Sequence, residues 1–238
     1  SLVTVTLNSG KSVGRTIDSV LSQSTLPLEY IFIDGGSQDN TLDIINSKQI
    51  GDRGIKFILE PQRLKNGIYG AINQGINAAS GDIIFIVHSD DWLEPEAARE
   101  VLAKFAEEPD CQIVLCPAFM HTTGGQKYLK DKRSFSLFPF LMPVIHPATF
   151  VRRNAYEKYG AYDEKYRISS DYDFFYRLHN AGAIFCEIRR PLVNVQLGGY
   201  ANTHREKARK ETLEIGLRHC RTTLLPVIAY LARKTLGR

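Results

Sequence analysis

Two adjacent carboxylates, Asp90 and Asp91, follow an apolar run in the first half of the chain and could bind a metal ion. Carboxylate oxygens are the ligands that Mg²⁺ and Mn²⁺ prefer in proteins. An ion held there would neutralise a diphosphate and stabilise it as a leaving group. In the alternative interpretation Asp91 caps the helix that Pro95 introduces, which leaves Asp90 unexplained. The pair therefore predicts a metal site at Asp90 and Asp91, with Mn²⁺ or Mg²⁺ as the cofactor.

A second acidic segment, Ser169 to Asp173, precedes aromatic and apolar residues at helical spacing. A general base needs a carboxylate within hydrogen-bond reach of the hydroxyl that it deprotonates, and Asp171 at a helix start could supply one. An aspartate in a first turn is also favoured by the helix dipole, whatever its function. The residues alone leave these two explanations of Asp171 equally open.

Three polar loops follow apolar runs in the first half of the chain: Asn8, residues 34–37 and residues 88–91. In open α/β sheets ligands bind at the carboxyl ends of the strands, where such loops converge. These residue types are also ordinary in turns, and Ser37 or Asp39 could simply cap the next helix. Each loop alone is typical of a turn, whereas the three together favour a ligand-binding crevice.

The elements that must position these loops alternate between strand and helix patterns. The expected strands are rich in β-branched and aromatic residues and cover Leu2–Leu7, Tyr30–Ile33, Lys56–Leu59 and Ile83–Val87. The expected helices are centred on residues 13–21, 41–45, 68–79 and 95–105. This alternation predicts an α/β fold with a Rossmann-like, mainly parallel central sheet and flanking helices.

The second half of the chain is less regular. We expect strands at Cys111–Cys116 and Thr149–Val151, a turn at Gly124-Gly125, helices at Asn154–Tyr159 and from Ser169, and a final strand pair at Ile184–Ile188 and Leu192–Val195. No linker is evident, so we expect one domain over residues 1–203 and a helical C-terminal extension over residues 204–238. Within that domain, residues 1–118 are the predicted nucleotide-sugar half and residues 119–203 the acceptor half.

Composition excludes several classes of protein. The net charge of +4 is too small to indicate a nucleic-acid partner. The four cysteines lack zinc-site spacing and predict reduced core residues in the cytosol. We expect no signal peptide, because Leu2–Leu7 leads straight into a strand pattern, and the longest apolar stretch is too short for a membrane span. Dinucleotide-binding, P-loop and nucleophile-elbow glycine motifs do not occur.

At this point the chain resembles the family-2 inverting glycosyltransferases with the GT-A fold, in particular those of bacterial polysaccharide and colanic-acid-type biosynthesis. The resemblance runs from Val3 to about Asn202 and rests on motifs in the expected order. These are Val5-Thr6-Leu7-Asn8, the segment from Glu29 to Thr41, the segment from Gly67 to Ile76, and Ala79-Ser80-Gly81-Asp82. Together they predict a GT-A fold.

The resemblance also implies roles for individual residues. It implies a nucleotide-sugar pocket formed by Thr6, Asn8, Asp34, Asn73, His88, Ser89 and Asp90. Asp90 is then the preferred metal ligand, and Asp171 is the base that deprotonates the acceptor hydroxyl. His146 falls on the acceptor side, and the loop from Gly198 resembles one that closes over the donor. The implied reaction is a single displacement with inversion, with UDP as the default nucleotide.

Four residues depart from the family pattern. Leu7 stands where an aromatic residue often stacks on the base, and His88 replaces the first acidic residue of the metal-binding motif. Gly70 and Ser170 replace a usual Asp and Glu. The motif of processive synthases is missing, since Trp92 is the only tryptophan. We therefore expect single sugars to be added to a sugar or a lipid-linked sugar acceptor.

The residues 218–238 combine apolar and basic side chains and could rest on an anionic bilayer. Packing against the domain or a partner chain is the alternative. The expected location is accordingly the cytoplasm, with peripheral contact at the inner face of the cytoplasmic membrane. Two other functions stay open: a nucleotidyltransferase that makes sugar nucleotides, and a non-catalytic relative that only binds them.

Overall fold

The computed structural model describes residues 1–63, 66–198, 204–220 and 222–235, and the statements below concern these residues. Its centre is a seven-stranded sheet with the order β10-β6-β9-β4-β1-β2-β3. Its strands are β1 (Leu2–Thr6), β2 (Glu29–Asp34), β3 (Lys56–Pro61), β4 (Ile83–Ile86), β6 (Ile113–Leu115), β9 (Thr149–Arg152) and β10 (Phe185–Glu187). All neighbours are parallel except that β9 runs antiparallel to both β4 and β6. The prediction of a mainly parallel sheet is confirmed.

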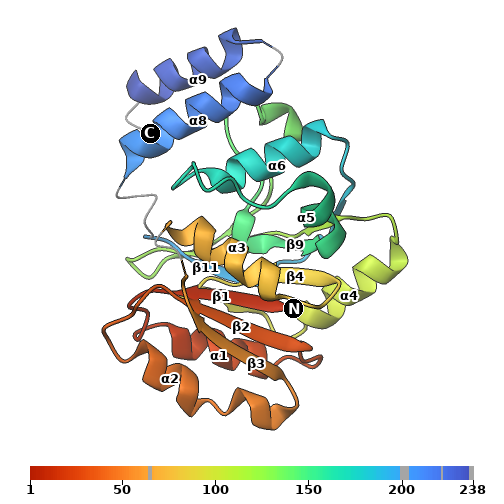
Figure 1. The fold of residues 1–238 in the computed structure, drawn as a ribbon. Helices are drawn as coiled ribbons and strands as arrows, with labels where there is room; N and C mark the ends of the chain where they lie inside the picture. Colours follow the sequence, from red (N-terminus) through yellow and green to blue (C-terminus); the bar gives the residue numbers. More distant parts are fainter. Residues whose placement is uncertain (64–65, 199–203, 221, 236–238) are drawn as a thin grey trace.

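Helices cover both faces of this sheet, as Figure 1 shows. One apolar core contains side chains of α1 (Val13–Leu21), α2 (Thr41–Ser47) and α4 (Ala97–Glu107). The other contains side chains of α3 (Ile68–Ala78), α5 (Arg153–Tyr159) and α6 (Ser170–Asn180). Because both faces are covered, every residue of β1 and β2 is buried, including the threonines of β1.

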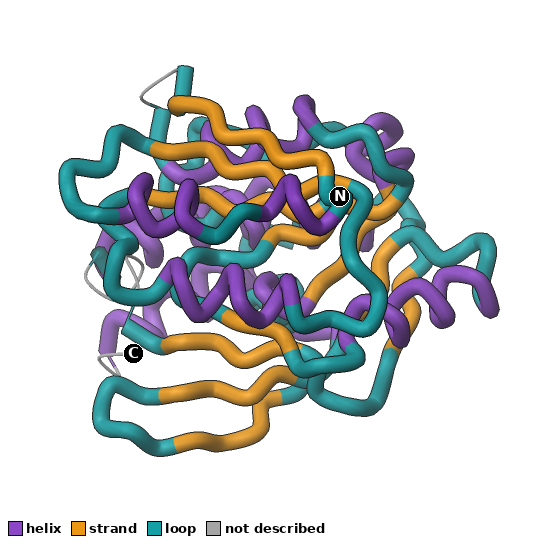
Figure 2. Tube along the Cα trace, turned by 90° about the horizontal axis from the view of Figure 1, so that it is seen from below, coloured by secondary structure: helices purple, strands orange, loops and turns teal. Residues whose placement is uncertain are grey.

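A second sheet of four strands has the order β5-β11-β7-β8. Its strands are β5 (Trp92–Leu93), β7 (Ala118–His121), β8 (Lys127–Lys130) and β11 (Val193–Gln196). Figure 2 shows the strands as two groups. The predicted pairing of the last two strands is wrong, because β10 joins the large sheet beside β6 while β11 pairs with β5 and β7. Three short 3-10 helices are η1 (Ile50–Arg53), η2 (Phe135–Leu137) and η3 (His146–Ala148).

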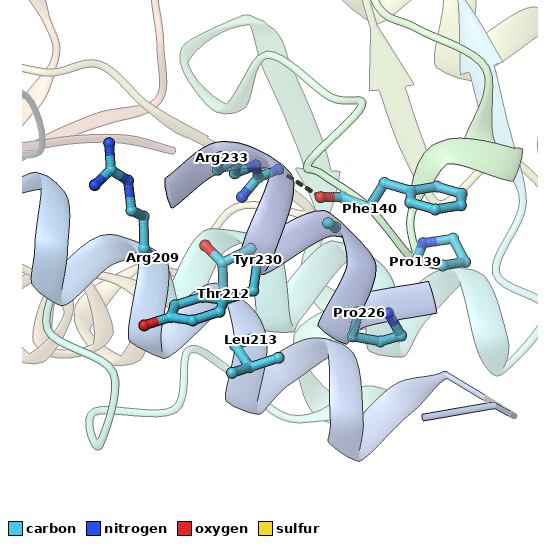
Figure 3. A pocket seen from close by; sticks show the side chains of 9 residues that line it. Pro139, Phe140, Arg209, Thr212, Leu213, Pro226, Tyr230 and Arg233 are labelled. Carbon is cyan, nitrogen blue, oxygen red and sulfur yellow. Dashed lines mark hydrogen bonds between the residues drawn. The ribbon is translucent and has the colours of Figure 1, made fainter. Parts of the chain in front are cut away.

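The C-terminal extension is helical, as expected, and consists of α8 (Arg205–His219) and α9 (Leu224–Thr235). In Figure 1 these two helices lie on the outer side of α6. Figure 3 shows where α9 meets the segment before β9: the Arg233 guanidinium donates a hydrogen bond to the carbonyl of Phe140, beside Pro139 and Tyr230. None of the helices in the described part of the chain is long and apolar enough to cross a bilayer.

The expectation of reduced cysteines is wrong for one pair. Cys111, just before β6, and Cys186 in the adjacent strand β10 form a disulfide with Cα atoms 6.0 Å apart. The neighbouring strands bring together two residues that lie 75 positions apart in sequence, which sequence spacing alone does not reveal. Cys116 and Cys220 carry free thiols.

Candidate active site

The order of the central strands places the predicted crevice between the loops that follow β1 and β4. The chain passes from β1 outward to β2 and β3, then returns to pair β4 with the other side of β1. The strand order reverses there, and ligands of open α/β sheets bind at such a point. The Ser9 hydroxyl lies 2.8 Å from the Ser89 hydroxyl, which joins the two loops directly. The predicted convergence of the loops after β1 and β4 is confirmed.

Asp34 ends β2 and braces the loop that follows it. Its carboxylate accepts hydrogen bonds from the Thr6 hydroxyl at 2.8 Å, the Gly36 N–H at 2.9 Å, and the N–H and hydroxyl of Ser37 at 2.8 and 2.6 Å. These bonds outweigh the effect of burial and hold the pKa of Asp34 below its ordinary value. Thr6 and Asp34 thus lie together at the carboxyl ends of β1 and β2, with the carboxylate already bonded to protein donors.

Asn8 connects the same loop to the end of β1. Its backbone adopts a left-handed conformation with φ of 51°, which asparagine tolerates better than most residues. Its N–H donates to the Ser37 hydroxyl at 2.9 Å, and its side-chain oxygen accepts from the Gln38 N–H at 2.8 Å. Asp39 accepts from the Thr41 N–H at 3.0 Å just before α2, but the N-cap of α2 is Asn40, so neither Ser37 nor Asp39 is the capping residue.

Asp90 and Asp91, which the sequence paired as metal ligands, have different environments. Asp91 is 2% exposed and accepts a hydrogen bond from the Gln196 N–H of β11 at 2.9 Å. Burial and the neighbouring Asp90 raise the pKa of Asp91 well above its ordinary value. The capping alternative for Asp91 is wrong, because the N-cap of α4 is Glu96. The Asp91 carboxylate instead joins the loop after β4 to strand β11 of the second sheet.

The Asp90 carboxylate is the better candidate ligand. It is only partly buried, and the structure shows its backbone carbonyl, not its side chain, accepting from the Arg15 guanidinium at 2.9 Å. No group of three or more His, Cys, Asp or Glu side chains that could enclose a metal occurs among the described residues. Mg²⁺ and Mn²⁺ held by one or two carboxylates and by phosphate oxygens need no such group. Asp90 therefore fits a metal bound together with a diphosphate.

A series of aromatic side chains, buried except for the half-buried His88, leads from this loop towards Asp171. The ring of His88 lies edge-on to His146, with ring centroids 5.5 Å apart. The His146 Nε2 lies 2.9 Å from the Tyr162 hydroxyl, and the Tyr162 ring is 5.4 Å from that of Tyr69. Burial lowers the pKa of His146 to about 3, so this imidazole is neutral at physiological pH. His146 thus contacts both His88, in the loop after β4, and Tyr162.

Asp171 is the second residue of α6 and is partly buried. Burial raises its pKa to about 6, although the hydrogen bond from the Tyr172 N–H, at 2.8 Å, favours the ionised form. A base is most effective when its pKa lies near the working pH. Such a pKa is far from that of an aspartate that merely caps a helix, and a carboxylate of this kind is a candidate general base.

Asn73 has a different environment from the other predicted nucleotide-sugar ligands. Its side-chain nitrogen donates to the Tyr162 carbonyl at 2.8 Å and to Glu164 at 2.9 Å, and its oxygen accepts from the Tyr162 N–H at 3.1 Å. It therefore joins α3 to the segment before α6. Gly70 makes room for Asn66, whose side chain donates to the same Glu164, since a Cβ at position 70 would lie 1.8 Å from the Asn66 side-chain oxygen.

Two residues at this site have no role in the sequence-based prediction. Tyr69 occurs inside a recognised motif, and its hydroxyl donates to the Ile168 carbonyl at 2.9 Å. Glu211 lies on α8 and contacts the segment before α6 through its carboxylate. Nothing in the sequence distinguishes Glu211 from the other acidic residues of α8, Glu206 and Glu214. The predicted donor-covering loop from Gly198 continues into residues 199–203, which lie outside the described residues.

This sheet order, with its reversal between β1 and β4, is that of the GT-A fold, which similar solved structures share. A sequence model described as glycosyl transferase family 2 matches residues 1–180. The chain belongs to glycosyl transferase family 2.

Relatives with similar sequences are bacterial glycosyltransferases. A PGL/p-HBAD biosynthesis glycosyltransferase of Mycobacterium bovis is 28% identical over 211 residues, which cover 85% of this chain and 79% of the relative. An uncharacterized glycosyltransferase of Mycobacterium tuberculosis is 31% identical over 215 residues, covering 87% and 78%. The predicted membership of this enzyme class is confirmed.

Similar solved structures share the fold. TarS of Staphylococcus aureus in complex with UDP-GlcNAc superposes with a TM-score of 0.71 at 15% identity, covering 96% of this chain and 69% of that one. A longer TarS structure is matched over 41% of its length. The mannosyltransferase PcManGT of Pyrobaculum calidifontis, in complex with GDP-Man and Mn²⁺, gives 0.70 at 12% identity, covering 100% and 75%.

Proposed function

We propose that the protein transfers a single sugar from a nucleotide sugar, with UDP as the carrier, to an acceptor hydroxyl with inversion of the anomeric carbon. The observation that carries this proposal is the place of the Asp171 carboxyl, at the start of α6 and next to Tyr69. Its raised pKa, about 6, suits proton transfer near neutral pH. Contacts through Tyr69, Tyr162 and His146 connect it to the metal loop at His88. A base and a diphosphate site on one crevice are what a direct displacement requires.

Asp90 is the residue that we assign to Mn²⁺ or Mg²⁺, and Asp91 supports it from the second sheet. A divalent ion bound with the donor supplies positive charge that offsets the charge developing on the diphosphate. The partly buried Asp90 side chain can face such an ion. The bond between Asp91 and the Gln196 N–H fixes the loop that carries Asp90. PcManGT was solved with Mn²⁺, and this supports the assignment.

The protein's own residues then organise the transfer. Thr6, Asn8 and Asp34 are the residues that we assign to the nucleotide site at the ends of β1 and β2. The exposed Leu7 offers an apolar surface there to the nucleobase of the donor. The acceptor oxygen forms the new bond to the anomeric carbon, and its proton passes to the Asp171 carboxylate. The old bond breaks with its electron pair on the diphosphate. Neutral His146 lies beside the path between the two reacting groups.

A cell-surface glycoconjugate, with a sugar or lipid-linked sugar as acceptor, is the product class that we propose. The mycobacterial relative is named for PGL/p-HBAD biosynthesis, and TarS was solved with UDP-GlcNAc. We propose that the reaction takes place at a membrane surface that presents the acceptor.

The surface that we assign to this membrane is the outer face of α9. Leu224, Val227 and Ile228 share one side of the helix and are 64%, 38% and 46% exposed, and the exposed Lys234 follows them. Anionic vesicles of phosphatidylglycerol should sediment the protein, and neutral phosphatidylcholine vesicles should not. Replacing Leu224 and Ile228 with Ser should abolish sedimentation. Equal recovery in the supernatant with both lipids would refute the assignment.

A thermal-shift panel tests the donor site first. UDP, GDP, dTDP and their common sugar conjugates are each added with Mn²⁺ and with EDTA, because a ligand of the native state raises the melting temperature. We expect a metal-dependent increase with one nucleotide family that is lost in Asp90→Ala and kept in Asp43→Ala, an exposed control. An absence of any shift would remove the basis for the proposal.

The base is tested by Asp171→Asn. We expect this variant to keep the nucleotide-dependent shift and to lose sugar transfer about 10²–10⁴-fold, the usual range for a missing general base. Nucleotide release from UDP-GlcNAc, with and without acceptor sugars, measures the rate. Wild-type turnover by Asp171→Asn would exclude this carboxylate as the base, whereas binding without turnover in the wild type would favour the non-catalytic alternative.

A further inference from the structure

Glu211 is a buried carboxylate of α8 with an unusual set of partners. It is 7% exposed, and its oxygens accept hydrogen bonds from three consecutive backbone N–H groups, those of Arg167 at 3.0 Å and of Ile168 and Ser169 at 2.9 Å. No cation lies within ion-pair distance of it in the part of the chain that the structure describes. A buried charge is costly unless it is hydrogen-bonded, and these three hydrogen bonds stabilise the Glu211 carboxylate in its buried position.

These three N–H groups belong to the segment that leads into α6. Ser169 is the N-cap of α6, its own side chain makes no capping hydrogen bond, and Asp171 is the second residue of the helix. The N–H of the N-cap residue Ser169 and the two N–H groups before it are thus satisfied from another element. The position of Asp171 therefore depends on a carboxylate 40 residues later, counted from 171 to 211.

A second contact holds α8 against α6, at a residue of α6 that follows Asp171. Asp173, which is 1% exposed, lies 2.7 Å from the His219 Nε2 and 3.5 Å from the Arg218 guanidinium at the end of α8. Glu211 and His219 are two helical turns apart and contact α6 on either side of Asp171. The start of α6 is held against α8 at two points, with the predicted base between them.

We propose that Glu211 is a positioning residue for sugar transfer, which holds the start of α6 so that Asp171 faces the acceptor hydroxyl. The inference rests on the proposed function of Asp171. Glu211 lies outside residues 1–180, which the family model covers, so the base of the shared domain is placed by the C-terminal extension. Misplacing a reacting group by about 1 Å can cost about 10²-fold in rate.

The charge of Glu211 adds a measurable signature to this geometric role. The groups that face Asp171 are Tyr69 on α3, Tyr162 before α6, and Glu211 on α8. The Glu211 carboxylate is a nearby like charge and contributes to the raised pKa of Asp171. Removing that charge should therefore lower the pKa of Asp171, which a purely structural contact would not do.

The test compares Glu211→Gln, which removes the charge, with Glu211→Asp, which keeps it but shortens the reach by one methylene. Glu206→Gln, at an exposed position of the same helix, is the control. The Asp171 carboxyl carbon is followed by NMR against pH, with Asp171→Asn identifying its signal. Nucleotide release from UDP-GlcNAc with Mn²⁺ gives the rate, and thermal shift with UDP gives donor binding.

We expect Glu211→Gln to shift the titration midpoint of Asp171 downward by about half a pH unit or more. Its rate should fall at least about 10-fold at unchanged UDP binding, since only the base is displaced. Glu211→Asp should retain the wild-type midpoint and lose rate, which separates position from charge. Should Glu211→Gln not fold, the rate and midpoint of Glu211→Asp carry the comparison.

An unshifted midpoint in Glu211→Gln, or a wild-type rate in either folded variant, would overturn the proposal. The NMR titration does not need turnover. A wild-type protein that neither binds nor hydrolyses a nucleotide sugar would therefore refute the function while the coupling of Glu211 to Asp171 is still measured.

Discussion

At the scale of single residues, Asp171 combines a catalytic assignment with a cost in stability. Its pKa of about 6 in the folded protein lies above its ordinary value. The folded state therefore binds the proton more tightly, and stability falls as pH rises from about 4 to about 6. We expect Asp171→Asn to be more stable than the wild type at pH 8 by about 1–2 kcal/mol, with no gain at pH 4. Urea unfolding at both pH values measures this, and an equal difference at the two would contradict it.

Glu29 shows the opposite behaviour. It accepts hydrogen bonds from the Ser1 hydroxyl, from the Ser80 N–H and hydroxyl and from the Gly81 N–H, and these outweigh the effect of burial and hold its pKa at about 2. The stability that they contribute is present above the ordinary pKa and is lost as pH falls towards 2. Glu29→Gln should lower stability at pH 7 by about 2 kcal/mol and change it little near pH 2. Acid unfolding followed by circular dichroism tests this, and an unchanged acid midpoint would rule it out.

At the scale of elements, two helix glycines have opposite surroundings. A Cβ on Gly75 of α3 would lie 2.3 Å from the Val3 side chain of β1, whereas on Gly14 of α1 it would lie 3.6 Å from Ile44. Alanine is the better helix former, by roughly 1 kcal/mol. Gly14→Ala should therefore raise the free energy of unfolding by up to about 1 kcal/mol, while Gly75→Ala should lower it by about 1–3 kcal/mol because α3 must move from the sheet. Chemical unfolding of both variants tests the contrast, and a stabilised Gly75→Ala would show that the sheet yields freely.

The contact of α8 with α6 gives a second prediction at this scale. His219→Ala leaves the buried Asp173 without its 2.7 Å partner, and we expect a loss of about 1–3 kcal/mol in stability. Lys210→Ala, at an exposed position of the same helix, should change stability by less than about 0.5 kcal/mol. Thermal melting of the two variants measures the difference. Similar melting temperatures would show that the contact between His219 and Asp173 does not stabilise the protein.

At the scale of the whole molecule, the sequence predicts the first half well and the second half less well. Continuous apolar runs identify β1 and β2 because both faces of the sheet are covered. No local sequence pattern predicts β5, a strand of two residues that follows Asp91, or the pairing of β11 with it. The convergence of Asn8, Asp34 and Asp90 follows from strand order. Asn73 bonds to the segment at Tyr162 and Asp91 bonds to β11. Both contacts are tertiary, and the local sequence pattern does not predict them.

The position of β9 has a consequence for synthesis of the chain. This strand lies antiparallel between β4 and β6, although β4 ends at Ile86 and β9 begins only at Thr149. While the ribosome makes the intervening residues, the apolar edge of β4 has no partner and can pair with another nascent chain. The large sheet closes when β9 emerges and is complete only when β10 adds to β6. Slow translation before residue 149 should therefore favour aggregation, and chaperones that bind unpaired strand edges should relieve it.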